Sequence, residues 1–227
     1  MKFIDIESYK FLEISQNPNI LISLKTDQCF SILSMNQREQ FLKNNFGIEA
    51  YREFNQVHET NIFQENSDPK KNYDGFIEVK RKRAYGIRTA DCIPLILWDK
   101  KLRTLVGLHC GWRGLANGII KKAFIKNNSY KINQAFIGPH ITKDYFEVKQ
   151  DLIDYFKQKN INLEPFLHEK GNVKTLDIKG ICVHQIKQLN TYITVKNGFC
   201  SYEKDDLFYS WRKNKEPTRR NITISWL

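Results

Sequence analysis

The spacing of apolar and polar residues predicts short strands that alternate with helices. Between Phe3 and Leu33 the two kinds of residue alternate in short runs, which is typical of two or three half-buried strands. Residues 36–46 carry the apolar spacing of a helix, with Asn36 as its expected cap. Residues 51–58 are predicted to form a strand that ends at His58.

The rest of the chain continues in the same way. Residues 86–98 read as one strand broken at Pro94, with residues 104–109 as its neighbour. Further helices are expected at 115–126, 149–158 and 177–189, and further strands at 134–137, 192–195 and 222–226. Because strands and helices interleave irregularly, the pattern predicts an α+β fold with a mixed β-sheet. A length of 227 residues fits a single domain spanning 1–227.

Composition excludes two classes of protein. With 41% hydrophobic residues the chain has enough apolar surface for a core, so it is not expected to be disordered. The apolar run Cys92–Trp98 is far too short to cross a bilayer. The N-terminal residues lack the pattern of a secretory signal, and the five cysteines form no CxxC pair. We therefore expect a cytoplasmic protein without a disulfide framework.

The net charge of +11 raises the question of nucleic-acid binding. The basic residues are scattered in small clusters, such as Lys80–Arg83, and no nucleic-acid motif accompanies them. A solvated basic surface explains this pattern, so nucleic acid is not an expected partner and neither is a membrane. Such a surface would still attract anionic substrates toward a cleft.

Three residues with metal-binding side chains follow apolar stretches and precede turns: His58, Cys92 and His109. If neighbouring strands bring these positions together, they form a set of two imidazoles and one thiolate. Zn²⁺ prefers such ligands, and a three-ligand site leaves a fourth position open for water or substrate. Taken singly, each residue also fits a structural role in the core. Cys92 alternatively fits a nucleophile with His109 as its base.

Several motifs in order resemble the YfiH/LACC1 family, formerly described as laccase-domain or polyphenol oxidase proteins and now associated with purine nucleoside phosphorylase activity. The match begins with Gln56-Val57-His58, Thr89–Pro94 and His109–Gly114. It continues with Phe136–Pro139, Phe146–Val148, Asp177-Ile178, Phe208–Lys213 and Arg220. These motifs run from about residue 55 to the C-terminus.

The resemblance implies a layered α/β sandwich of the YfiH type. It also implies a zinc site at His58, Cys92 and His109, with zinc expected rather than copper. The implied activities are phosphorolysis of adenosine, inosine and methylthioadenosine, and deamination of adenosine. The expected partners are therefore nucleosides and phosphate, while the oligomeric state is left open.

Given these reactions, further residues become candidates for catalysis. Arg113, in a glycine-flanked turn before a predicted helix, suits the binding of phosphate, with Arg88 and Arg212 as further candidates. Glu147 and Asp91 are candidates for the carboxylate that would shuttle a proton in deamination. For stacking on a purine, the candidates are Trp112 and Tyr209.

The sequence departs from the family pattern at two positions beside the expected metal. Glu59 stands where a glycine is usual, and Cys110 replaces an alanine, as a packing variant or a competing ligand.

Three alternative functions remain: a metal- or cysteine-dependent amidase or editing hydrolase of cell-wall precursors, a single-copper oxidoreductase, and a nucleic-acid-binding module. A multicopper oxidase is excluded, because five histidines without an HxH pair cannot serve several coppers.

Overall fold

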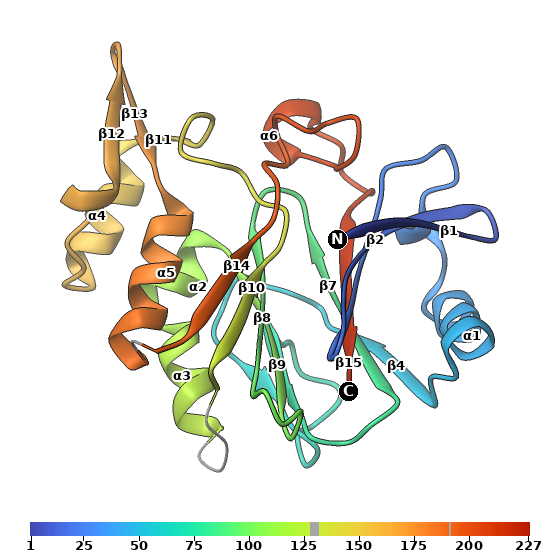
Figure 1. The fold of residues 1–227 in the computed structure, drawn as a ribbon. Coiled ribbons are helices and arrows are strands. Elements are labelled where there is room, and N and C mark those ends of the chain that lie inside the picture. The colour runs from blue at the N-terminus through green and yellow to red at the C-terminus, as the bar shows by residue number, and fades with distance from the viewer. Residues whose placement is uncertain (128–131, 191) are drawn as a thin grey trace.

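Two six-stranded β-sheets stacked on each other form the centre of the molecule (Figure 1). The computed structural model describes residues 1–127, 132–190 and 192–227. The first sheet has the order β1 (Lys2–Ile6), β2 (Tyr9–Gln16), β3 (Asn19–Ser23), β15 (Asn221–Trp226), β7 (Arg83–Thr89), β4 (Ala50–Glu53). The second has the order β14 (Thr194–Asn197), β10 (Gln134–Ile137), β8 (Ile93–Trp98), β9 (Leu105–Cys110), β6 (Gly75–Glu78), β5 (Ile62–Phe63).

Both sheets are mixed. Neighbouring strands are antiparallel except for the parallel pairs β4–β7, β10–β14 and β5–β6. A small third sheet is antiparallel and has the order β11 (Glu147–Val148), β13 (Val173–Leu176), β12 (Leu167–Lys170).

Helices cover the outer faces of the two large sheets, and a buried apolar layer fills the space between them. Helix α1 (Met35–Phe46) packs on the first sheet through Phe41 and Leu42. The helices α2 (Trp112–Ala116), α3 (Ile119–Lys126), α4 (Gln150–Gln158) and α5 (Ile178–Leu189) share one core with the second sheet. The layer between the sheets contains Ile22 and Ile87 from one sheet and Phe76 and Ile96 from the other. A short helix α6 (Trp211–Asn214) and the 3₁₀ turns Phe30–Ile32 and Glu164–Phe166 complete the described elements.

The α+β class and the layered sandwich are confirmed, with two mixed sheets where a single one was predicted. The helices expected at 149–158 and 177–189 and the strands at 104–109, 134–137 and 222–226 lie within a residue or so of the predicted ranges. The N-terminal alternation corresponds to β1, β2 and β3.

Four predicted details are wrong, and three of them concern the start, the end or the continuity of an element. The cap of α1 is Ser34, which forms a capping box with Gln37, two residues before Asn36. The strand predicted to end at His58 already ends at Glu53. The helix expected over 115–126 is divided into α2 and α3 at Gly118, whose φ of +77° lies in the left-handed region that interrupts a helix.

The stretch 86–98 also differs from its prediction. It forms two strands, β7 and β8, which belong to different sheets, and the chain crosses between them at residues 90–92. Pro94 lies inside β8 and does not break it; its carbonyl oxygen accepts a hydrogen bond from Gly138 at 2.9 Å. The crossing therefore falls at Cys92, not at the proline.

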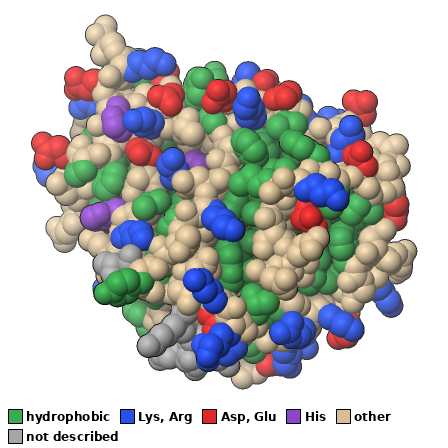
Figure 2. Space-filling view, viewed as in Figure 1, with side chains coloured by type: hydrophobic (Ala, Val, Ile, Leu, Met, Phe, Trp, Pro, Cys, Tyr) green, Lys and Arg blue, Asp and Glu red, His purple; other side chains and the backbone are tan. Residues whose placement is uncertain are grey.

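Two further properties concern the length of the helices and the charges on the surface. None of the helices in the described residues is both long and apolar enough to cross a membrane. On the face shown in Figure 2, Lys and Arg side chains are spread among apolar and uncharged groups.

Candidate metal centre

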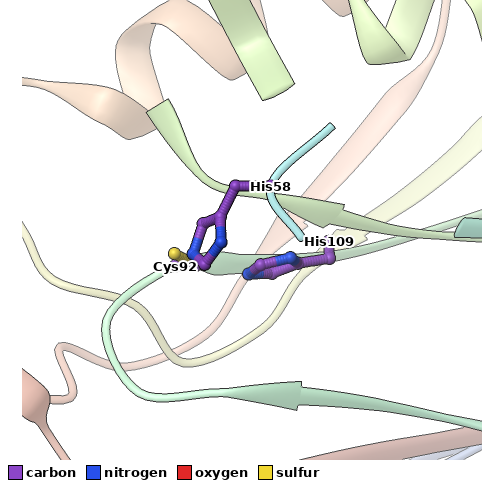
Figure 3. A group of neighbouring side chains, drawn as sticks. All are labelled: His58, Cys92 and His109. Atoms are coloured by element: carbon purple, nitrogen blue, oxygen red, sulfur yellow. The ribbon is translucent and has the colours of Figure 1, made fainter. Parts of the chain in front are cut away.

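The side chains of His58, Cys92 and His109 converge at one end of the stacked sheets (Figure 3). Their ligand atoms all lie within 4.8 Å of one another, and the two imidazole rings are 4.7 Å apart between centroids. Donors around a tetrahedral zinc ion, bound at about 2.0–2.3 Å, lie about 3.5 Å apart. A small contraction of this cluster would therefore place all three atoms on one metal ion. Among the described residues this is the one such group of metal-binding side chains.

Each of the three residues reaches the cluster from a different part of the chain. His58 lies in the loop that leads from β4 in the first sheet to β5 in the second, with a left-handed φ of +61°. Cys92 lies where the chain crosses from β7 to β8, one residue after Asp91, whose φ is +91°. His109 is on β9, beside Pro94 of β8. The left-handed conformation of His58 and the positive φ of Asp91, the residue before Cys92, direct these two loops toward the site.

The carboxylate of Asp74 positions two of the three candidate ligands. Its Oδ1 lies 2.8 Å from Nδ1 of His109. The same carboxylate accepts hydrogen bonds from the backbone N–H groups of Val57 (3.1 Å), His58 (2.9 Å) and Glu59 (2.8 Å). With Nδ1 of His109 donating to Asp74, Nε2 is the nitrogen left for a metal ion, as in many carboxylate–histidine–zinc arrangements.

Burial would by itself raise the pKa of Asp74. The hydrogen bonds from His109 and from the backbone of Glu59 and Val57 outweigh burial and hold the pKa below its usual value. The carboxylate is therefore ionised and can keep its four hydrogen bonds at neutral pH.

Cys92 and His109 shift each other's pKa. Burial favours the neutral thiol, but the charge of His109 and hydrogen bonds from His109 and His58 lower the pKa of Cys92 to about 6. Burial likewise favours neutral imidazole, but the charge of Cys92 and the hydrogen bond to Asp74 raise the pKa of His109 to about 9. In the metal-free protein the site thus holds a thiolate beside an imidazolium, and the thiolate is the form that binds zinc.

The cluster opens into a cavity of about 610 Å³. This volume lies in the range of small-molecule binding sites. The aromatic side chains of Phe54, Trp112, Phe146 and Trp211 line it. The charged lining residues outside the metal cluster are four arginines and a single acid: Arg88, Arg113, Arg212, Arg220 and Asp91. The cavity therefore combines an apolar surface for a flat ring with an excess of positive charge.

Two of the three predicted catalytic residues line this cavity. Arg113 is exposed, and its guanidinium lies over the ring of Trp112 at 4.6 Å. Asp91 lines the cavity as well, but its carboxylate already accepts hydrogen bonds from the hydroxyl of Ser201 (2.8 Å) and the backbone N–H of Arg212 (2.6 Å). Asp91 thus anchors the start of α6 beside the site.

Glu147 lies outside the metal-site cavity. It is exposed and lines a neighbouring cavity of about 530 Å³. Its backbone carbonyl oxygen accepts two hydrogen bonds of 3.1 Å from Arg212, which lines both cavities.

Of the other candidates, Arg88, Arg212 and Trp112 line the metal-site cavity. Tyr209 is buried and does not line it. Cys110 is fully buried in the core that the second sheet shares with the helices, and it lies outside the candidate metal cluster. The position of Cys110 therefore favours a role in core packing over a role as a competing metal ligand.

Sequence reasoning missed two residues of the site. The pair Asp74-Gly75 has the pattern of a turn, yet Asp74 is 1% exposed and directly precedes β6. Arg220 was noted only as a motif residue, yet its side chain lines the cavity. An acidic residue directly before a buried strand was the one available signal for Asp74.

Known proteins with similar sequences belong to the family that the motifs resemble. Residues 15–227 match the family described as "Multi-copper polyphenol oxidoreductase laccase". The chain is 25% identical over 231 residues to a purine nucleoside phosphorylase of Clostridium acetobutylicum, covering 96% of both chains. It is 33% identical over 82 residues to the adenosine deaminase RL5 of an unknown prokaryotic organism, covering 34% of this chain and 31% of that protein.

The fold has close counterparts among solved structures. The crystal structure of the Bacillus licheniformis protein YfiH superposes with a TM-score of 0.79 at 20% identity, covering 99% of this chain and 98% of that one. The metal-binding residues, the order of the motifs and the sandwich fold agree with the family match, which covers nearly the whole chain. The chain therefore belongs to the YfiH-type family described as multi-copper polyphenol oxidoreductase laccase.

Proposed function

We propose that this protein is a zinc-dependent purine nucleoside phosphorylase acting on adenosine, inosine and methylthioadenosine. The observation that carries the proposal is the three-residue metal cluster, which opens into a cavity with aromatic walls and four arginines. Relatives that match over most of the chain are named purine nucleoside phosphorylases. A purine, a ribose and a phosphate together need flat apolar surface, polar groups and positive charge, and the cavity offers all three.

The donor set supports zinc as the metal. Two imidazoles, one thiolate and an open fourth position suit Zn²⁺, and Asp74 supplies the outer hydrogen bond that such sites use. A blue-copper site has the same three ligands with a long axial methionine, but among the described residues no methionine lines the cavity. Bound zinc would supply a Lewis acid that polarises a substrate atom.

In the proposed reaction, a bond between phosphate and the ribose replaces the bond between the ribose and the purine. An oxygen of hydrogenphosphate bonds to C1′ of the ribose while the C1′–N9 bond breaks. The electron pair of that bond leaves with the purine, and the proton of hydrogenphosphate ends on the purine. The products are the free base and ribose 1-phosphate, or 5-methylthioribose 1-phosphate when the substrate is methylthioadenosine. The chain's own part is to hold the phosphate charges with arginines and to fix the purine against Phe54, Trp112 or Phe146.

We propose adenosine deamination as the minor reaction. The name of the relative RL5 supports it, and a metal-bound water is the usual nucleophile for it. Deamination also needs a free carboxylate to move protons. Among the described residues, Asp91 is the one carboxylate that lines the cavity, and it is already hydrogen-bonded to Ser201 and Arg212.

The test incubates zinc-loaded protein with adenosine, inosine or methylthioadenosine, with and without phosphate, and separates the products. We expect phosphate-dependent release of adenine or hypoxanthine. Cys92→Ala and His109→Ala should lose this activity, while the control His168→Ala, on β12 outside the cavity, should keep it. No free base from the zinc-loaded wild type with any of the three nucleosides would overturn the proposal.

A further inference from the structure

Two of the cavity's arginines, Arg88 and Arg220, lie on or directly before neighbouring strands of the first sheet. Arg88 on β7 pairs with Ile222 on β15. Arg220 directly precedes β15 and lies two residues before Ile222, so Arg88 and Arg220 stand at diagonal positions on the same side of the ladder. Both side chains line the cavity that contains the metal cluster.

Each guanidinium is held in place by the protein. Nη1 of Arg88 lies 3.4 Å from Oε2 of Glu53, and Nη2 lies 3.5 Å from the carbonyl oxygen of Thr218. Gln56 holds the backbone of Arg88 through two hydrogen bonds, at 2.8 and 2.9 Å. Nη1 of Arg220 donates to the carbonyl oxygens of Glu216 (3.0 Å) and Arg219 (2.7 Å).

These contacts leave donors of Arg220 available. In the part of the chain that the structure describes, its Nε and Nη2 atoms have no hydrogen-bond partner. The side chain is therefore fixed through one nitrogen and can offer its other N–H groups to a ligand.

The positive charge of this pair is not balanced by the protein. Glu53 is shared, because its carboxylate also binds Arg38 at 2.6 Å. The carboxylate of Glu216 accepts hydrogen bonds from the N–H and hydroxyl of Thr218 instead of from Arg220. Burial and the charge of Arg88 lower the pKa of Arg220, against the influence of Glu216, Cys92 and Asp91. Two like charges placed together in a cavity repel each other unless an anion lies between them.

The other two arginines are less suited to a shared anion. The guanidinium of Arg113 is exposed and lies 4.6 Å from the ring of Trp112, and both Nη atoms of Arg212 donate to the carbonyl oxygen of Glu147. Arg220 also lies over a tryptophan, 6.0 Å from the ring of Trp211, but its hydrogen bonds to two carbonyl oxygens fix its guanidinium inside the cavity. Arg88 and Arg220 are therefore the pair whose positive charge and N–H groups are best placed to bind an anion.

We propose that Arg88 and Arg220 form the binding site for free inorganic phosphate, held between their two guanidinium groups. This inference rests on the proposed phosphorolysis and assigns its anionic co-substrate to two residues. Because Arg88 and Arg220 line the cavity that also contains His58, Cys92 and His109, the bound anion would lie in the cavity of the candidate metal site, where a nucleoside would meet it.

The test titrates zinc-loaded protein with inorganic phosphate by calorimetry and measures KM for phosphate and for the nucleoside separately. Arg220→Gln should weaken phosphate binding about tenfold or more, since a charged hydrogen-bonded contact is removed. Arg220→Lys, which keeps the charge but loses the fork, should show a smaller loss. Zinc content and nucleoside affinity should stay as in the wild type. Arg219→Gln removes the same charge one residue away, outside the cavity, and should leave phosphate binding intact.

The outcomes separate this inference from the proposed function. Unchanged phosphate affinity in folded Arg220→Gln, or a loss equal to that of Arg219→Gln, overturns the assignment even if phosphorolysis occurs. Phosphate binding that depends on Arg220 supports the assignment even if no nucleoside is cleaved. A third arm uses adenosine 5′-monophosphate. Dependence on Arg220 for the nucleotide but not for inorganic phosphate would show a nucleotide phosphate site and overturn the inference.

Discussion

At the residue scale, the most consequential side chain is one that does not itself join the cluster. Asp74 holds the ring of His109 and, through three backbone N–H groups, the loop that carries His58. A single buried carboxylate thus fixes the direction of two candidate ligands. Without it, the backbone of the His58 loop would lose its main hydrogen-bond acceptor.

Replacing Asp74 by Asn should weaken zinc binding about 10- to 100-fold, because an amide cannot accept all four hydrogen bonds and no longer fixes the His109 ring. Competition with a metal chelator measures the affinity. Asp99→Asn is a matched control, since Asp99 is also 1% exposed but binds Arg103 away from the cavity. Equal zinc affinity in Asp74→Asn and wild type would contradict this role.

The second prediction at this scale concerns the thiolate. In metal-free protein, Cys92 should deprotonate with a midpoint near pH 6, below the usual value of about 8.5 for cysteine. Zinc must displace the proton of His109 below about pH 9 and that of Cys92 below about pH 6. Zinc affinity should therefore weaken as the pH falls below 9, and more steeply below 6, where the thiol also becomes protonated. The thiolate absorbance of wild type minus that of Cys92→Ser gives the midpoint. In His109→Gln the midpoint should rise, and a wild-type midpoint near 8.5 would argue against the ion pair.

At the scale of elements, the site is built from connections and not from strand centres. His58 and Cys92 lie on the two connections that lead from the first sheet to the second, and Gly111 caps α2 directly behind them. A Cβ at Gly111 would lie 2.8 Å from Cδ2 of His58 and 3.2 Å from Sγ of Cys92. The start of α2 thus limits how far these two side chains can move.

Gly111→Ala should therefore displace His58 and reduce zinc affinity, although its φ of −73° is open to alanine. Chelator competition again reads out the affinity. Gly47→Ala serves as the contrast: it strains the left-handed end of α1, with φ of +65°, in open space. It should lower the thermal midpoint but leave zinc affinity unchanged. Zinc affinity equal to that of the wild type in Gly111→Ala would show that Gly111 does not limit the position of His58.

The elements also show where sequence reasoning succeeds. Strands and helices with a regular apolar period, such as β9, β10, α4 and α5, lie close to their predicted positions because burial of one face decides them. The motifs led to the three residues that converge in space.

The predictions are wrong where contacts between residues far apart in the sequence determine the backbone conformation. The predicted strand over 51–58 ends early, because Asp74 binds the backbone of residues 57–59. The crossing at residues 90–92 is held by Ser201 and by the N-terminus of α6, more than a hundred residues away. Arg220 enters the cavity through pairing of β15 with β7. None of these partners is visible in a local pattern.

At the scale of the whole molecule, a metal ion in the cluster would tie the two sheets together. Two of its ligands lie on connections between the sheets, and the third is on β9 of the second sheet. Binding that occurs only in the folded state stabilises that state by mass action. The metal would thus contribute to the stability of the sandwich as well as to its chemistry.

Added zinc should raise the thermal midpoint of metal-free protein. At free zinc 100 times its Kd the gain is about 2.7 kcal/mol, which corresponds to roughly 5–10 °C for a chain of this length. Differential scanning calorimetry measures the shift, with magnesium as the control metal. Cys92→Ala should show little of the zinc effect, and a shift of wild-type size in that variant would place the stabilising zinc elsewhere.

The central claim is that His58, Cys92 and His109 hold one zinc ion, and X-ray absorption at the zinc edge tests it most directly. The spectrum of the zinc-loaded protein should show two nitrogen ligands at about 2.0–2.1 Å and one sulfur at about 2.3 Å. The sulfur contribution should vanish in Cys92→Ala. A zinc environment without sulfur in the wild type, or one with the same sulfur signal in Cys92→Ala, would contradict the account.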